Sequence, residues 1–271
     1  MADPTPVFDD LRAESDELDL LVAELSPERW ALPTPAPAWS VAHQIAHLAW
    51  TDRSALLAVT DVDAFHTLVE KALVSPGSFV DEGAEEGAGL PPAELLARWR
   101  EGRAALDTAL REAPHGVRFP WYGPPMSAAS MATARLMETW AHGLDIADAL
   151  DVVRTPSDRL KHVVWIGVRT RDFAFGVHGL PAPLDDFRIE LVAPSGELWA
   201  YGPEGAPQRV TGPALDFCKL VTQRAHRSDL ALRAEGPDAD RWFDIAQVFA
   251  GPPGEGRAPT GEGRAPKGAS R

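Results

Sequence analysis

Apolar residues recur three or four positions apart along most of the first 150 residues of the chain. This period is that of an amphipathic helix, whose apolar stripe faces a core. Ser26-Pro27 follows the first such segment as a stop signal, and Ser40 precedes the second as an N-cap. Helices are predicted over residues 7–25, 41–59, 63–73, 92–111 and 127–150. The four long segments predict a helical bundle.

Three segments between these helices break the pattern. Residues 32–38 are rich in proline and predict a linker. Residues 75–92 are acidic and rich in glycine, and they predict a loop. Residues 119–125 combine prolines with Trp121 and Tyr122, which predicts a loop just before the last helix of the bundle.

Beyond Thr155-Pro156 the pattern changes. One more helix is predicted over residues 157–177. Apolar residues then alternate with polar ones over residues 187–192, and a Pro-Ser-Gly turn leads to residues 198–201, which together predict a β-hairpin. The remaining elements are predicted as a strand near 209–210, a helix over 213–224, a strand over 230–233 and a helix over 240–249. The fold class is therefore α+β.

The expected domain organisation follows from this change of pattern. A four-helix bundle is expected over residues 1–154, and a small α+β domain over residues 155–250. The last segment, 251–271, contains Gly-Glu-Gly-Arg-Ala-Pro twice and has almost no apolar residues to bury. It is expected to be a disordered tail.

Composition narrows the function classes. The net charge of −14 and the pI near 5.0 disfavour nucleic acid and anionic membranes as partners. No apolar stretch is long enough to cross a bilayer, and the start carries no targeting signal, so a cytoplasmic protein is expected. Cys218 is the single cysteine and lies among apolar neighbours, which predicts a buried, inert thiol. Any thiol chemistry would then need a thiol from outside.

The strongest candidate chemistry is a Glu138/His142 pair on the predicted helix 127–150. Residues four apart share one helical face, so a third ligand from another helix completes three corners of a metal site. His47 on the helix 41–59 is the candidate for that ligand. His43 is its rival, because the two histidines are themselves four residues apart. Three protein ligands leave an open position, which distinguishes a catalytic metal from a structural one.

Other residues are candidates for supporting roles. Glu138 lies between Met137 and Trp140 on an apolar helix, so its carboxylate needs a partner, either a metal or a nearby arginine. Asp145, three residues after His142, is a candidate to orient that imidazole as a hydrogen-bond acceptor or to act on the helix electrostatically. Trp50 and Trp121 are candidates to line a pocket, and Arg53 and Arg135 to bind a carboxylate of the substrate or thiol. Trp99 and Trp165 are expected to be packing residues.

Two motifs carry a family resemblance. Trp39-Ser40-Val41 leads to Ala46-His47-Leu48, and Glu138-Thr-Trp-Ala-His142 follows on a later helix. In these motifs the chain resembles the mycothiol-dependent maleylpyruvate isomerase family, whose N-terminal domain is DinB-like. The resemblance implies a DinB-like four-helix metal-binding domain followed by a small α/β domain, and it covers most of the chain except the tail.

The resemblance also implies a site. His47, Glu138 and His142 would hold a divalent metal, usually zinc, and a low-molecular-weight thiol such as mycothiol would be the co-substrate. An arginine late in the C-terminal domain contributes to the family's active site, and Arg224 stands at the matching place. The family usually has glycine before that arginine, whereas this chain has Gln223.

The leading hypothesis is a metal-dependent enzyme that activates a small thiol, which then attacks a small electrophilic substrate. An isomerase would expel the thiol after rotation about the former double bond, whereas a transferase would release the adduct. One alternative is a thiol-independent metal-dependent hydrolase, and another is a non-catalytic metal-binding protein. Small molecules are the expected partners of a monomer or homodimer.

Overall fold

The computed structural model describes residues 4–75 and 77–260. The chain forms two compact units, Met1–Thr155 and Pro156–Arg271, and each is described by itself. The first unit is helical and the second combines helices with a small sheet. The predicted fold class, a four-helix bundle followed by a small α+β domain, is confirmed. Among the described residues, no helix is long and apolar enough to cross a membrane.

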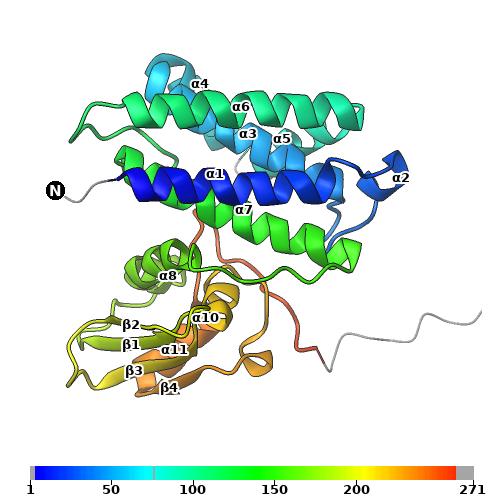
Figure 1. Cartoon of the computed structure of the whole chain (residues 1–271). Coiled ribbons are helices and arrows are strands. Elements are labelled where there is room, and N and C mark those ends of the chain that lie inside the picture. Colours follow the sequence, from blue (N-terminus) through cyan, green and yellow to red (C-terminus); the bar gives the residue numbers. More distant parts are fainter. Residues whose placement is uncertain (1–3, 76, 261–271) are drawn as a thin grey trace, which may run out of the picture. The chain divides into compact units, whose positions relative to one another are not determined.

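The first unit is built around one central helix. Helix α3 packs against α5, α6 and α7, while α1 packs chiefly against α7 (Figure 1). The predicted helices over 41–59, 92–111 and 127–150 are confirmed as α3, α6 and α7. The helices of this unit are α1 (Thr5–Val22), α2 (Pro27–Trp30), α3 (Val41–Thr60), α4 (Val62–Val74), α5 (Phe79–Ala88), α6 (Pro92–Glu112) and α7 (Ala128–Leu150).

Large apolar side chains from α1, α3, α6 and α7 fill the bundle core. Leu18, Ile45, Trp99 and Ile146 are all fully buried in one cluster. Burying one side chain of this size stabilises the fold by about 1.5–3 kcal/mol, before the entropy cost of ordering it. The predicted packing role of Trp99 is confirmed. The core therefore holds α3 and α7, the two helices that carry the candidate ligands, in a fixed relation.

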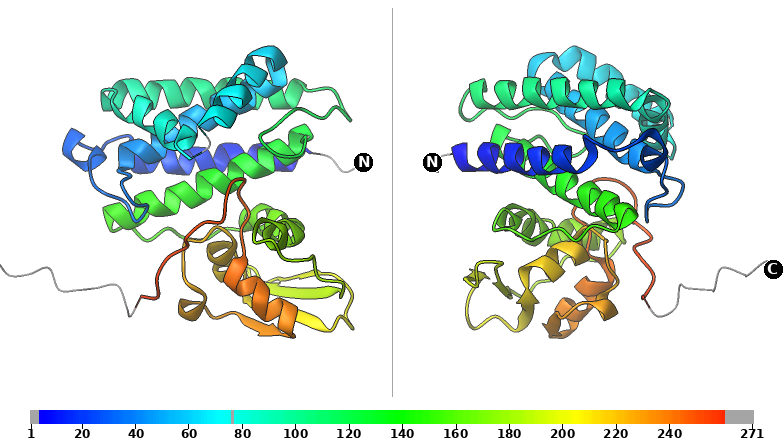
Figure 2. Two further views of the ribbon diagram at one scale, coloured as in Figure 1. Left: turned by 180° about the vertical axis from the view of Figure 1, so that it is seen from behind. Right: turned by 45° about the vertical axis from the view of Figure 1, so that its right-hand side comes forward.

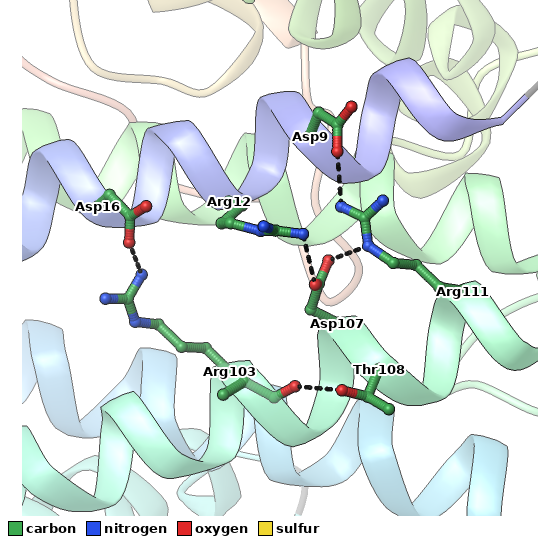
Figure 3. A network of polar contacts seen from close by, with 8 residues as sticks. Asp9, Arg12, Asp16, Arg103, Asp107, Thr108 and Arg111 are labelled. Atoms are coloured by element: carbon green, nitrogen blue, oxygen red, sulfur yellow. Dashed lines mark hydrogen bonds and ion pairs between the residues drawn. The ribbon is translucent and has the colours of Figure 1, made fainter.

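Besides the apolar core, charged pairs join α1 to α6. Arg12 and Arg111 of the two helices both contact Asp107, and Asp16 pairs with Arg103 (Figure 3). Asp19 accepts hydrogen bonds from Arg100 and Arg103 of α6. A cavity of about 390 Å³ lies between the helices, and its lining includes Arg12, Asp16, Arg100, Arg103 and Asp107.

The predicted loop over residues 75–92 is wrong for its central part, because α5 (Phe79–Ala88) lies there. Asp81 and Glu82 occupy the first turn of α5, where carboxylates stabilise a helix N-terminus. The glycines that predicted a loop allow α5 to lie close to α3. A Cβ on Gly83 would lie 2.9 Å from the Trp50 ring, and one on Gly87 would lie 2.7 Å from the Cβ of Ala46.

The second unit is a four-stranded sheet in the order β2-β1-β3-β4. β1 pairs antiparallel with β2 and parallel with β3, and β3 pairs antiparallel with β4. Helices α10 and α11 pack on the sheet (Figures 1 and 2), where Trp242 contacts Phe187 and Phe217 edge to face. The elements are α8 (Leu160–Arg169), α9 (Arg171–Val177), β1 (Phe187–Val192), β2 (Leu198–Tyr201), β3 (Gln208–Pro213), α10 (Ala214–Val221), β4 (Arg233–Glu235) and α11 (Pro237–Ile245).

The predicted hairpin over 187–201 is confirmed as β1 and β2, whereas the helix predicted over 157–177 is divided between α8 and α9. The break falls at Thr170, whose hydroxyl donates to the carbonyls of Ile166 and Gly167 and so competes with the helical ladder. The predicted packing role of Trp165 is wrong, since 43% of this residue is exposed. The strand predicted over 230–233 lies later, as β4.

The segment expected to be a disordered tail covers residues 251–271. Its described part makes hydrogen bonds within the second unit: the Gly254 amide donates to Gln247, and the Thr260 amide donates to Asp229. The rest of the expected tail, 261–271, lies outside the described residues.

Candidate metal centre

Helices α3 and α7 bring His47, Glu138 and His142 together. One ligand atom from each residue lies within 4.8 Å of the other two. The Glu138 Oε2 atom is 3.6 Å from Nε2 of His47 and 3.1 Å from Nε2 of His142. Both histidines are buried and Glu138 is partly buried. The predicted trio therefore converges, with the imidazole Nε2 atoms facing the carboxylate.

The spacing of these atoms suits a tetrahedral metal. Zinc bonds to nitrogen and oxygen of about 2.0–2.1 Å place neighbouring ligands of a tetrahedron about 3.3 Å apart. The two measured distances to the Glu138 oxygen, 3.1 and 3.6 Å, lie on either side of that value. Two imidazole nitrogens and one carboxylate oxygen are also a donor set that zinc accepts.

A chain of hydrogen bonds fixes the proton on His142. The Thr34 hydroxyl donates to the Trp39 carbonyl, so its oxygen is left to accept from the Gln44 amide nitrogen. Gln44 must therefore present Oε1 to Nδ1 of His142, 2.5 Å away, and Nδ1 is the donor. The Nε2 lone pair then faces the Glu138 carboxylate at 3.1 Å, an arrangement that needs a proton or a cation between the two atoms.

The charge of Glu138 depends on the same contacts. Burial by itself would raise the pKa of the Glu138 carboxyl, but hydrogen bonds and charge interactions with His142 and His47 lower this pKa well below its ordinary value. The carboxylate is consequently present near neutral pH and ready to bind a cation.

Gln44 is a functional candidate that the sequence analysis missed. It lies on α3 three residues before His47, so helical spacing places both side chains on one face. That spacing could have indicated Gln44 as a neighbour of the site, although glutamine is a common surface residue. Asp145, predicted to orient His142, is buried on α7, and its role as an acceptor for that imidazole stays a prediction.

His43, the rival of His47, lies outside the trio. Its Nδ1 accepts from the Ser40 amide, and its Nε2 lies 2.8 Å from the Glu85 carboxylate of α5. The contact with the Ser40 amide belongs to a capping box at the start of α3, as the N-cap prediction for Ser40 requires. His43 thus anchors the helix that carries His47.

Two tryptophans lie against the imidazoles. The Trp39 ring centroid is 5.2 Å from that of His47 and 5.9 Å from that of His142. Its indole N–H donates to Asp81 of α5 over 2.9 Å. The ring of Trp50, a predicted pocket residue, lies 6.1 Å from the His47 ring.

The predicted loop residue Trp121 belongs to the same aromatic group. It stacks on Phe65 and contacts Tyr122, which in turn lies 6.3 Å from the Trp50 ring. Phe79 of α5 contacts Trp50 edge to face at 5.0 Å. Burial raises the pKa of the Tyr122 hydroxyl, which stays protonated.

The two arginines predicted to bind a carboxylate differ in their surroundings. Arg135 is almost fully buried and its Nε donates to Asp52 over 2.8 Å, so its charge is already paired within the bundle. Arg53 is exposed on α3. A ligand carboxylate would reach Arg53 without displacing a partner that the structure records, whereas reaching Arg135 would require breaking its pair with Asp52.

Arg224 and Cys218 belong to the second unit. The Arg224 Nη1 donates to the Thr222 carbonyl just after α10. Gln223, which stands where the resemblance predicts glycine, has a φ of 57°, in the left-handed region that favours glycine. Cys218 is fully buried, and burial raises the pKa of its thiol well above the ordinary value. The predicted burial of Cys218 is confirmed, and its lack of reactivity stays a prediction.

Comparisons with known proteins identify relatives of the whole chain. The family described as "Mycothiol maleylpyruvate isomerase N-terminal domain" matches residues 11–147, and the family described as "Wyosine base formation" matches residues 183–235. Two uncharacterized proteins of Mycobacterium tuberculosis, from strains CDC 1551 and H37Rv, are each 59% identical over 257 residues. Each alignment covers 95% of this chain and 100% of the relative.

Solved structures show the same fold. The crystal structure of the mycothiol-dependent maleylpyruvate isomerase has a TM-score of 0.58 and 17% identity. A mutant of that enzyme has a TM-score of 0.59 and 16% identity. Both alignments cover 88% of this chain and 96% of the other, so the likeness of fold extends over most of both chains.

Proposed function

Because the chain belongs to the family of the mycothiol maleylpyruvate isomerase N-terminal domain, we propose that it is a divalent-metal-dependent enzyme acting with a low-molecular-weight thiol. The thiol, of the mycothiol type, reacts with a small electrophilic substrate by isomerisation or S-transfer. The convergence of His47, Glu138 and His142 at three-ligand spacing carries this proposal.

Zinc is the metal that we propose. His47 and His142 would hold it through Nε2, and Glu138 through a carboxylate oxygen, which leaves a position open. A cation bound there supplies positive charge that favours the anionic form of a thiol near neutral pH. The Nδ1 atom of buried His47 makes no hydrogen bond that the structure records, and a water molecule would satisfy it.

The residues around the trio orient it and limit its access to water. Gln44 fixes the tautomer and the ring plane of His142, so the imidazole is set in place before a ligand arrives. Trp39 and Trp50 cover the flanks of the His47 imidazole with apolar rings. Since Cys218 is buried, the reacting thiol comes from solution.

Further residues belong to this proposal. We assign Arg53 to contact with a carboxylate of the thiol or substrate and Asp145 to support of His142, as the sequence predicts. The catalytic role of Arg224 stays what the family resemblance implies. We also place the enzyme in the cytoplasm, where low-molecular-weight thiols are kept reduced, as a monomer or homodimer acting on small molecules.

The test combines metal analysis with kinetics. Zinc content per chain is measured for the wild type, for His47→Ala and for His43→Ala, and each protein is then assayed with and without added mycothiol. We expect about one zinc per chain in the wild type and in His43→Ala, and loss of both zinc and thiol-dependent turnover in His47→Ala. His43→Ala is the matched control, because it removes a histidine of the same helix.

The results separate the alternatives. Equally weak zinc binding by the wild type and His47→Ala would refute the metal site. Turnover of a small ester or amide that is indifferent to thiol would favour a hydrolase instead. Stoichiometric zinc without any turnover would favour a non-catalytic metal-binding protein.

A further inference from the structure

The ring contacts beside the candidate metal centre form a continuous chain of aromatic side chains. We call Trp39, Trp50, Phe79, Trp121 and Tyr122 the aromatic wall. Successive rings along it are in contact: Trp50 lies 5.0 Å from Phe79 and 6.3 Å from Tyr122, and Tyr122 lies 5.2 Å from Trp121. The imidazole of His47 joins Trp39 to Trp50.

Each ring of the aromatic wall is half-buried, so each keeps part of its surface accessible. The wall draws its members from the loop before α3, from α3, from α5 and from the loop before α7. An aromatic ligand would gain binding free energy both from leaving water and from ring stacking. The aromatic wall can thus contribute binding free energy for a ligand directly beside the candidate metal centre.

Apart from a bound metal ion, the charged side chains near the aromatic wall offer a dianionic substrate little attraction. Asp81 of α5 accepts a hydrogen bond from Trp39, and the Glu85 carboxylate lies beside His43. Both carboxylates add negative charge to this side of the site. Arg135, one turn before Glu138 on α7, is paired with Asp52. Arg53 is exposed, and water and salt weaken the attraction of an exposed charge.

We propose that the electrophile is an uncharged, planar enone carrying an aromatic ring, which packs against the aromatic wall. This inference rests on the proposed function and narrows its substrate class. The thiol sulfur bonds to the β-carbon, the electron pair of the C=C bond moves toward the carbonyl, and the proton of the thiol ends on the α-carbon. No oxidant or reductant is required, because the product contains all atoms of the two reactants.

Asp81 is a positioning residue in this arrangement. The Trp39 ring lies nearly parallel to the His142 imidazole, at an interplanar angle of 21°, while its N–H is tied to Asp81. Without that acceptor the indole loses the bond that fixes its rotation. Asp81 therefore sets the face that Trp39 offers to a planar ligand without touching the ligand.

The kinetic test uses the full-length zinc protein with mycothiol and three electrophiles. These are 4-phenylbut-3-en-2-one, its ring-free counterpart pent-3-en-2-one, and the dianion maleate. We expect kcat/KM to be highest for the phenyl enone. Trp50→Leu should raise its KM roughly tenfold and Trp50→Phe about threefold, and both should raise the KM for pent-3-en-2-one by a smaller factor. Trp165→Leu, which removes an exposed tryptophan of the other unit, should change neither.

The positioning role of Asp81 is tested by the KM values of its variants. Asp81→Ala should raise the KM for the phenyl enone severalfold while leaving kcat and the KM for pent-3-en-2-one unchanged. Asp81→Asn keeps an oxygen that accepts the indole N–H, so it should restore the wild-type KM. Equal losses for both electrophiles in Asp81→Ala would mean a merely structural role.

A binding measurement separates failure of this inference from failure of the proposed function. The saturated analogue 4-phenylbutan-2-one cannot react, and its Kd is measured by calorimetry on the wild type, Trp50→Leu and Trp165→Leu. Thiol-dependent turnover with a higher kcat/KM for maleate would overturn the substrate class and leave the proposed function standing. If no electrophile reacts, the proposed function fails, and a Kd that Trp50→Leu leaves unchanged would overturn the aromatic subsite as well.

Discussion

The Nδ1 atom of His142 lies 2.5 Å from the Oε1 atom of Gln44, and Thr34 holds Gln44 in that orientation. A hydrogen-bonded support of this kind typically changes metal affinity 10- to 100-fold. We therefore expect Gln44→Ala to weaken zinc binding by about that factor without changing the number of zinc sites. Competition with a chelator of known affinity at constant pH measures the change.

Gln44→Glu provides the control for this effect. A carboxylate accepts the same proton from His142 and makes the imidazole a stronger base, so zinc affinity should be retained or raised. Zinc binding by Gln44→Ala that is as tight as in the wild type would contradict a supporting role for this contact.

The ion pairs of Asp19 with Arg100 and Arg103 of α6 make the free energy of unfolding depend on pH. A hydrogen bond from Arg100, together with the charges of Arg100 and Arg103, lowers the pKa of the Asp19 carboxyl below its ordinary value, against the effect of burial. A lowered folded pKa stabilises the native state above the unfolded pKa of about 3.9. That stabilisation is lost as the pH falls through the folded value.

We accordingly expect Asp19→Asn to lower the free energy of unfolding by roughly 1–2 kcal/mol at neutral pH. The difference from the wild type should stay constant from about pH 5 to 8 and shrink below about pH 4. Urea unfolding at a series of pH values checks this. Asp16→Asn, which removes a more exposed partner of Arg103, should cost much less. A difference that grows toward acid would contradict the assignment.

Apolar spacing was sufficient to predict the long helices, because burial of one stripe on α3, α6 and α7 dominates their formation. It was also sufficient to place His47 and His142 on facing helices. The failure at residues 79–88 has a physical cause. Gly83 and Gly87 lie within a helix because their positions pack too closely against α3 for a larger side chain. The local sequence does not show this contact, because it depends on the position of α3.

The supports of the candidate site were harder to predict for a related reason. The contact of Trp39 with Asp81 joins residues 42 positions apart, and that of His142 with Gln44 joins residues 98 positions apart. Neither pair leaves a local pattern in the sequence. His47 and His43 were separable only through the family resemblance, because the capping contact of His43 depends on how the preceding loop folds.

Cys218 is expected to be unreactive in the native protein. The side chain is fully buried, and burial raises its pKa well above the ordinary value, so the thiolate is scarce near neutral pH. A disulfide reagent such as DTNB at pH 8 should label the native chain far more slowly than the chain in 6 M guanidinium. Fast labelling of the folded protein would contradict this burial. It would also make Cys218 itself a candidate for the reacting thiol.

The contact between α5 and α3 can be tested with two glycines that occupy helices in different surroundings. Alanine in place of a helical glycine stabilises by about 0.5–1 kcal/mol where there is room for the methyl group. Gly102 of α6 has such room, because nothing lies within 4 Å of the added Cβ. Gly87 has none, because the Cβ would lie 2.7 Å from the Cβ of Ala46 and 3.3 Å from its Cα.

We expect Gly102→Ala to raise the midpoint of urea unfolding and Gly87→Ala to lower the free energy of unfolding by about 1–3 kcal/mol. The higher helix propensity of alanine cannot offset the clash of its methyl group with Ala46. The backbone of α3 cannot move aside as a flexible side chain can. Displacement of α5 also carries Asp81 away from Trp39, so Gly87→Ala should weaken binding of 4-phenylbutan-2-one while zinc content stays at the wild-type value. Equal stabilisation by both substitutions would show that α5 does not lie against α3 in solution.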